Sequence, residues 1–450
     1  MSSPVSPALR LMLAAGLLWA AVPGAALPAW AANAPTKIPA TPAKPPTTPT
    51  LDALLKEAVE RSPGVRAAKE RYEAARARVP GQGLRPDPMV EGGVMSLWGL
   101  MGPEVSVSQT FPLGGKLETE RQMAESEVAV AHQAYRAALN ELLAEVKRAY
   151  YDLYFYQQSA AIVERNKQLL TQLAKIANAR YAVGQGKQSD VLRINTQLAE
   201  VMNEAVLVRQ QLEGNNARLL GLLNRKFDSS PKAMAPIPSL KAVPFNRPVT
   251  EILKAAESRN PAILQAQAAL VAGEAALASA RTISTPDVTT KLGVAQAYMG
   301  MGWETVVSGM VGTNIPVSSR QREAAAVGAA ETELAARRSG LEDQRRAVTA
   351  GVHRYLADIR NLAERVRLYE LGLLPQARQA LQSELANYQV GRSDFDAVLT
   401  AQLNLYRYER DLQQAIADYQ KALVEIEALT AEGLPSAVDE ASAVPTKETP

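Results

Sequence analysis

The sequence predicts a mainly α-helical chain with a small β part, in which one structural unit occurs twice. Similar motifs recur in the same order about 200 residues apart. Long segments carry apolar residues at heptad spacing, and four short segments alternate apolar with polar residues. We expect the first structural repeat over residues 51–225 and the second over 249–432.

The first 31 residues have the features of a cleaved secretory signal peptide. A short n-region ends at Arg10, an apolar run covers residues 11–22, and small residues flank Trp30. The run is shorter than the roughly 20 residues that span a bilayer, which disfavours the alternative of a membrane-anchoring helix. We therefore expect export of the chain and cleavage near Ala31.

Three further segments lie outside the two repeats. Residues 32–50 carry six prolines among Ala, Thr and Lys, residues 226–248 form a second Pro-rich stretch, and residues 433–450 are mostly small or polar. Such compositions bury too little apolar surface to offset the entropy lost on ordering. They predict an N-terminal linker, a linker between the repeats and a disordered C-terminal tail.

Equivalent motifs mark the two repeats. The Pro-Asp pair at 86–87 returns at 286–287, and the Tyr-x-Val-Gly motif at 181–184 returns at 388–391. Because order and spacing are both kept, duplication of one half is the simplest account. Each half is expected to contain a helix, a strand pair, a very long helix, a tight turn and a second long helix.

The long helices are predicted from an absence of helix breakers and from heptad spacing. Residues 117–183 contain neither Gly nor Pro, so one helix of about 65 residues could extend roughly 100 Å. In the second repeat, apolar residues from Val348 to Leu373 follow one another in steps of four and three. A narrow apolar seam predicts neighbouring helices alongside, and Pro375 predicts a kink.

The strand pairs are predicted at 89–96 with 104–111, and at 288–298 with 304–314. These lengths suit the roughly 9–11 residues needed to cross an outer membrane. Four strands cannot close a barrel, and open strand edges are not tolerated in lipid. Membrane insertion would therefore require several chains to share one barrel.

Two tryptophans stand at the hairpin tips. Trp98 and Trp303 fit the preference of aromatic residues for the membrane interface. The alternative is a pair of periplasmic hairpins with ordinary turn residues.

Composition excludes several other classes of protein. Lys plus Arg number 49 against 46 Asp plus Glu, which leaves little net field to hold a nucleic acid. Cysteine is absent, so there are no disulfides, no thiolate sites and no lipid-modified N-terminal cysteine. His132 and His353 do not occupy equivalent positions, and no Ser, His and Asp set suggests a triad. We expect no catalytic residues, no cofactor and no metal site, and no membrane-spanning helix after the signal peptide.

Taken together, these residues resemble the TolC-like outer-membrane efflux proteins. The resemblance covers about residues 51–430. It rests on the duplication, on Arg-Pro-Asp-Pro at 85–88, on the segment 107–116 that leaves the first hairpin, and on the two Tyr-x-Val-Gly turns. It implies a homotrimer whose long coiled helical hairpins form an α-barrel, continued by a shared 12-stranded transmembrane β-barrel with four strands per chain. The first hairpin also resembles the heavy-metal efflux branch.

The resemblance further implies partners and their contact residues. It implies docking on a periplasmic adaptor protein, an inner-membrane transporter of the resistance-nodulation-division type, and lipid of the outer membrane. The two turns would lie at the periplasmic tip, where the adaptor-contact candidates are Tyr181, Gly184, Gly186, Ser189, Tyr388, Gly391 and Ser393.

The tip also contains candidates for a pore constriction, namely Asp190, Asp394 and Asp396. One aspartate per chain would become three facing carboxylates in a trimer, which would concentrate negative potential. The alternative for Asp190 and Asp394 is helix N-capping. The nearby basic residues are expected to be solvated surface charges rather than partners of these aspartates. They are Lys187, Arg193 and Arg392.

The predicted function is passive conduction of substrate from an inner-membrane pump across the periplasm and outer membrane of a Gram-negative bacterium. The cargo would be heavy-metal cations or small toxic organic molecules. One alternative is a periplasmic coiled-coil scaffold without channel activity. Another is a helical hydrolase, which would require a carboxylate pair in a groove that the sequence does not display.

Overall fold

A computed structural model describes residues 50–97, 100–226, 234–298, 302–314 and 319–434. The predicted signal peptide, nearly all of both tails and Trp98 lie outside these ranges.

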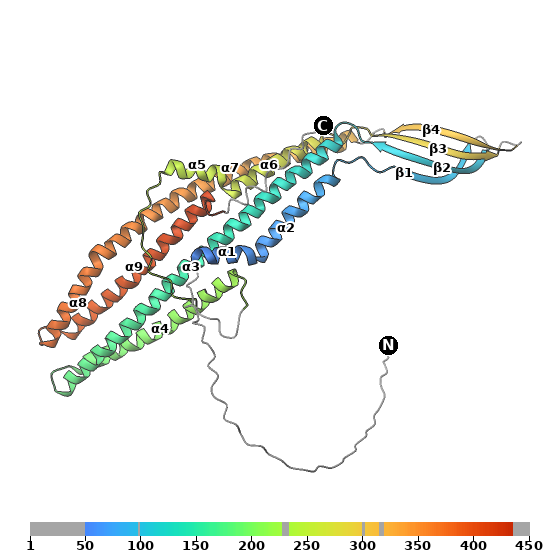
Figure 1. Ribbon diagram of the computed structural model, residues 1–450. Helices are drawn as coiled ribbons and strands as arrows, with labels where there is room; N and C mark the ends of the chain where they lie inside the picture. The colour runs from blue at the N-terminus through green and yellow to red at the C-terminus, as the bar shows by residue number, and fades with distance from the viewer. Residues whose placement is uncertain (1–49, 98–99, 227–233, 299–301, 315–318, 435–450) are drawn as a thin grey trace, which may run out of the picture. The chain divides into compact units, whose positions relative to one another are not determined.

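The same order of elements occurs twice along the described chain (Figure 1). The first half contains α1 (Leu51–Arg61), α2 (Pro63–Arg78), the 3-10 turn η1 (Val79–Gly81), β1 (Met89–Leu97), β2 (Leu100–Phe111), α3 (Lys116–Ala182) and α4 (Gln188–Leu222). The second contains α5 (Val249–Arg259), α6 (Pro261–Ala280), β3 (Val288–Tyr298), β4 (Trp303–Thr313), α7 (Ser319–Leu368), the π-helical turn η2 (Tyr369–Leu373), α8 (Leu374–Gln389) and α9 (Phe395–Thr430). The predicted fold class, mainly helical with two strand pairs, is confirmed.

Equivalent caps separate the two short helices of each half. The Ser62 hydroxyl accepts a hydrogen bond from the Val65 N–H at the start of α2. The Asn260 side chain accepts from the Ala262 and Ile263 N–H groups at the start of α6. A proline follows each cap at the first helical position, where its missing N–H has no intrahelical partner to lose.

The long helices follow the predicted boundaries closely. Helix α3 is continuous for 67 residues, as expected for a segment without Gly or Pro. The second long helix is interrupted by η2 directly before Pro375. Proline has no N–H to donate within a helix, and the wider π-turn tolerates this missing hydrogen bond. At the position of the predicted kink, the helix therefore changes locally from α to π.

The strands form one antiparallel sheet in the order β1-β2-β3-β4. Strand β2 starts at Leu100, four residues earlier than predicted, because it remains paired with β1 through Gly102 and Pro103. Strand β4 starts at Trp303, one residue earlier than predicted. Strands β1 and β4 are the outer strands, so each leaves one edge unpaired within the part of the chain that the structure describes.

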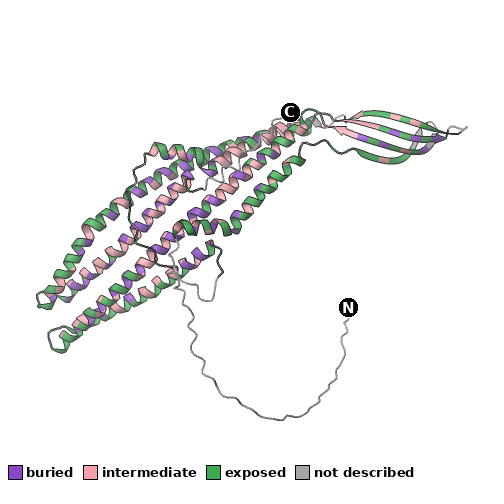
Figure 2. Cartoon of the chain, in the orientation of Figure 1, coloured by how far each residue is buried: buried purple, intermediate pink, exposed green. Residues whose placement is uncertain are grey.

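Buried residues follow the helices as interrupted stripes (Figure 2). They form three apolar clusters. The first joins α1, α3 and α4 to α9, the second joins α3 and α4 to α8 and α9 near the turns, and the third joins α5, α6 and α7 to α9. Because α9 takes part in all three, the last helix of the chain packs the two halves together.

Ion pairs reinforce the contact between α3 and α9. Arg148 donates to Glu425 at 2.8 Å and Lys421 donates to Asp152 at 3.0 Å. These groups are only partly exposed, so water screens them less than an ordinary surface pair.

Helix α6 bears on the prediction that no helix after the signal peptide spans a membrane. Within the described residues it alone is long and apolar enough to cross a membrane by length and composition, with a mean hydropathy of 1.3 over its window. One such helix is weak evidence for a span. Its alanine-rich surface packs against α3 and α7, and small side chains of this kind allow close helix packing.

Candidate functional site

The two turns that join the long helices have the same backbone geometry. Gly184 and Gly391 both have positive φ, at 73° and 76°. The Gly184 N–H donates to the Tyr181 carbonyl, and the Gly391 N–H donates to the Tyr388 carbonyl. Helices commonly end on glycine in this left-handed conformation, because glycine lacks the Cβ that would clash. The sequence-based placement of both turns is confirmed.

The equivalent tyrosines of the two turns differ in burial. Tyr388 is 4% exposed and packs edge-on against Phe395 at 5.5 Å between ring centroids. Tyr181 is 48% exposed. Burial raises the pKa of Tyr388, although the nearby Arg180 opposes this shift, so the hydroxyl stays protonated at neutral pH.

Arg180 connects the two turns. Its guanidinium lies 4.5 Å from the Tyr388 ring centroid and donates to the Tyr388 carbonyl. This residue was not singled out from the sequence. Its position in the last turn of α3 could have indicated this role, because a basic side chain there can donate to carbonyls at a helix end that have no partner within the helix.

Two ion pairs link the halves at the tips. Lys187 lies 3.5 Å from Asp394, and Arg193 is paired with Asp396. The expectation that these cations are merely solvated is therefore wrong for Lys187 and Arg193. All four side chains are more than half exposed, so each pair contributes at most about 1 kcal/mol. Arg392 forms no ion pair with the described residues.

The structure also decides between capping and other roles for the aspartates. Lys187, rather than Asp190, occupies the N-cap position of α4. Asp394 does occupy the N-cap position of α9, but its side chain makes no capping hydrogen bond. The Asp190 carboxylate accepts a hydrogen bond from the Ser189 hydroxyl at 3.4 Å and forms no ion pair within the described residues.

Carboxylates gather beside the second turn. A surface hollow of about 540 Å³ is lined by Glu384, Asp394 and Asp396, with small or neutral residues of α8 and α9 between them. The Ser393 hydroxyl donates to Glu384 at 2.5 Å. The hollow combines these three carboxylates with a lining that is about half apolar, from alanines of α8 and α9.

The sheet has one face whose apolar side chains are largely exposed among the described residues. Register places Val107 opposite Val90 and Leu292, and Val294 opposite Val307, so these side chains share a face. The exposed apolar residues of this face are Val90, Val94, Val105, Val107, Leu292, Val294, Val307 and Val311. A large exposed apolar surface marks a site of contact with lipid or protein.

The opposite face is polar and lined by small residues. Lys291 donates to Glu91 at 2.6 Å, and a Cβ at Gly293 would come within 2.6 Å of the Glu104 carboxylate. At the hairpin end, Trp303 is 62% exposed and packs edge-on against Tyr298 at 5.8 Å. An aromatic pair at the end of an apolar face fits an interfacial position.

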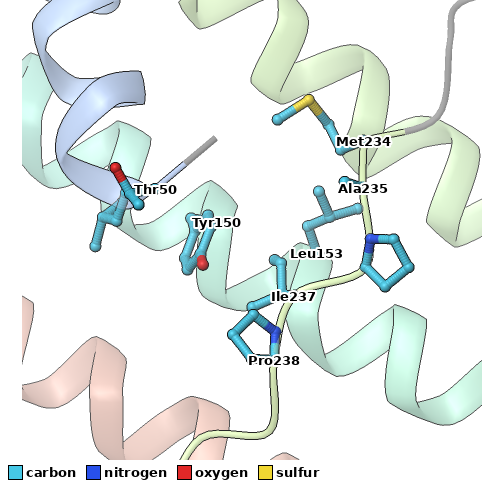
Figure 3. A pocket seen from close by; sticks show the side chains of 9 residues that line it. Thr50, Tyr150, Leu153, Met234, Ala235, Ile237 and Pro238 are labelled. Atoms are coloured by element: carbon cyan, nitrogen blue, oxygen red, sulfur yellow. The ribbon is translucent and has the colours of Figure 1, made fainter. Parts of the chain in front are cut away.

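A cavity near the middle of α3 offers little for catalysis. It has a volume of about 510 Å³, and Figure 3 shows Tyr150 and Leu153 of α3 gathered around it with Ile237 and Pro238 of the linker. Tyrosine is the one titratable residue type in its lining. The neighbouring Tyr151 has its pKa raised to about 12 by burial, so it exchanges no proton near neutral pH.

The described residues contain no group of three or more acidic or His residues arranged to hold a metal. His132 is buried in α3, with its ring 5.1 Å from that of Tyr72 in α2. It packs between α2 and α3.

The family model for outer membrane efflux proteins matches residues 54–225 and 252–432. The chain belongs to the outer membrane efflux protein family. This assignment confirms the family suggested by the sequence and agrees with a role in efflux rather than in enzymatic catalysis.

Individual proteins agree with the family assignment. The chain is 29% identical to protein CyaE of Bordetella pertussis over 245 residues, which cover 53% of this chain and 51% of CyaE. The match therefore spans about half the length of that relative. The fold is similar to the crystal structure of CusC, with a TM-score of 0.72, 18% identity and coverage of 84% and 91% of the two chains. It is also similar to the open MtrE outer membrane channel of Neisseria gonorrhoeae, with a TM-score of 0.68, 18% identity and coverage of 85% and 89%.

Proposed function

We propose that this chain is the exit duct of an efflux system, which conducts substrate passively from an inner-membrane pump through the periplasm and outer membrane. The observation that carries the proposal is the sheet. It has one exposed apolar face, one polar face and two unpaired edges. A sheet of this kind is stable in lipid only as part of a closed barrel.

A homotrimer accounts for both the sheet and the helices. Three chains with four strands each would close a 12-stranded barrel, which is a size seen in membrane barrels. Within one chain, α3 of the first half contacts α6 and α9 of the second half. The duplication then predicts that α7 and α8 contact α2 and α4 of another copy. Exposed apolar residues support this arrangement, namely Val206 and Leu207 on α4, and Leu368 and Leu371 at the η2 interruption.

The tips would contact a periplasmic adaptor protein, which in turn contacts an inner-membrane transporter of the resistance-nodulation-division type. The adaptor-contact residues are the two turns with their flanking positions, and the acidic hollow favours a basic partner surface. Asp190, Asp394 and Asp396 remain the candidates for a constriction. Asp190 is the strongest of these, because it has no cationic partner within the described residues.

The substrate class stays open between heavy-metal cations and small toxic organic molecules. The described residues contain no metal cluster, so metal cargo would pass through solvent and not along a chain of ligands. Export would use the predicted signal peptide. Anchoring would not depend on an N-terminal lipid, because the chain has no cysteine.

Detergent extraction, mass measurement and planar-bilayer recording together test the proposal. We expect the protein to fractionate with outer membranes, to contain three chains per particle and to form discrete conductance steps. A monomer in the soluble periplasmic fraction without conductance would instead support a periplasmic scaffold.

A further inference from the structure

The segment before β1 contacts the side chains of β2 at the end of the sheet nearest the helices. The Gln109 amide donates to the Pro86 carbonyl at 2.6 Å, and the Arg85 guanidinium carbon lies 5.8 Å from the Phe111 ring centroid. Gln109 and Phe111 alternate along β2 with the same period as Val107, so they belong to the apolar face. Arg85 therefore lies on that face, where the strand ends.

The Arg85 guanidinium is available to a ligand. Arg85 is exposed, and apart from the Phe111 ring it has no ion pair or side-chain hydrogen bond with the described residues. The adjacent Leu84 is 64% exposed. An arginine with free donors next to exposed apolar side chains matches the boundary between lipid headgroups and acyl chains.

We infer that Arg85, with Phe111 and Leu84, binds the phosphodiester of an anionic phospholipid in the leaflet nearest the helices. The inference rests on the proposed membrane insertion of the sheet. The planar guanidinium can donate two parallel hydrogen bonds to phosphate oxygens. The Phe111 ring holds its orientation by a cation–π contact, and Leu84 contacts the upper part of the acyl chains.

Each chain carries one such site. The equivalent of Arg85 in the second half is Thr285, which has no positive charge. Arg76 and Arg78 are exposed in the last turn of α2, shortly before this segment, and they add positive potential that attracts an anionic headgroup.

Native mass spectrometry of the detergent-purified protein with added phosphatidylglycerol tests the inference. We expect the wild type to retain one phosphatidylglycerol per chain, and Arg85→Gln to weaken this retention by about fivefold. Phe111→Leu, which keeps the apolar face but removes the ring, should weaken it by a smaller factor. The matched control is Arg209→Gln, since Arg209 is an exposed arginine of α4 far along the chain from the sheet.

Equal phosphatidylglycerol retention by Arg85→Gln, Arg209→Gln and the wild type would overturn the lipid site. So would replacement of the lipid by inorganic phosphate at equal concentration, because this would show that the acyl chains are not recognised. Bilayer conductance of the same preparations keeps the two proposals separate. A wild type that retains lipid but forms no channel would overturn the exit-duct function and leave the lipid site intact.

Discussion

The guanidinium of Arg193 in α4 donates to the carboxylate of Asp396 in α9, so the starts of the two helices are joined by residues 203 apart in the sequence. Both side chains are more than half exposed. Lys187 and Asp394, the residues just before α4 and α9, form a second and longer contact. These exposed ion pairs add to the buried apolar cluster that joins α3 and α4 to α8 and α9 near the turns.

Removing this contact should favour opening at the tips. Arg193→Gln abolishes the pair, and an exposed pair contributes up to about 1 kcal/mol, so we expect the ratio of open to closed channels to rise about two- to fivefold. Single-channel recording measures the ratio directly. Arg392→Gln is the control, since Arg392 forms no ion pair with the described residues. An equal effect of both variants would show that the Arg193–Asp396 pair does not hold the tips closed.

Glycine substitutions test the strain at the turns. Gly184→Ala and Gly391→Ala place a Cβ at positive φ, which costs about 1–2 kcal/mol per residue. We expect faster amide hydrogen exchange around each turn. Gly214→Ala is the contrast, because Gly214 lies inside α4 with open space around its Cα. This change should instead stabilise by roughly 0.4–1 kcal/mol.

Acid should weaken the ion pair between Glu57 in α1 and Arg225, which follows the end of α4. Arg225 donates to both carboxylate oxygens of Glu57, at 2.6 and 2.9 Å, and these hydrogen bonds lower the pKa of Glu57 from its usual value. A lowered folded-state pKa stabilises the fold above the unfolded pKa, and this contribution is lost as the pH falls through the folded value.

Glu57→Gln should therefore reduce stability at pH 7 by about 1 kcal/mol, and the difference from the wild type should disappear as the pH falls through the lowered folded-state pKa of Glu57. Thermal unfolding in detergent across this pH range measures the effect. Glu60→Gln, on the same helix but without an ion pair in the described chain, should change little at any pH.

A buried amide pair couples the two halves between the tips and the centre of α3. Gln402 donates to Asn166 at 2.7 Å, and both residues are 3% exposed. Gln402→Leu should cost about 1–3 kcal/mol, because it leaves a buried Asn166 without its partner. The double variant with Asn166→Leu should lose less than the sum of the single changes, as a double-mutant cycle of thermal unfolding would show. Strict additivity would contradict the coupling.

The two faces of β4 should respond differently to a charge. Val307 is 74% exposed on the apolar face, whereas Met310 is 60% exposed on the polar face. Val307→Arg should prevent stable insertion, because an arginine near the middle of the bilayer costs about 2–4 kcal/mol on the lipid face of a barrel. Met310→Arg should insert normally. Outer-membrane fractionation of the two variants distinguishes these outcomes.

The sequence by itself determined the features that depend on local interactions. An unbroken run without Gly or Pro specifies α3, a period of two specifies the strands, and Gly184 and Gly391 specify left-handed turns. Family membership followed because these signals recur twice in a fixed order. Among these local elements, the predicted bounds differed most at the start of β2, where pairing with β1 continues through Gly102 and Pro103.

Only the tertiary structure decided which distant side chains meet. The pairs Arg193 with Asp396 and Gln402 with Asn166 depend on how far α9 is shifted along α3 and α4, a quantity that no local pattern encodes. The position of Arg85 over Phe111 likewise depends on the path of the chain across the sheet. Charges and amides have little preference for particular partners in an extended chain, and packing of the long helices and pairing of the strands select those partners.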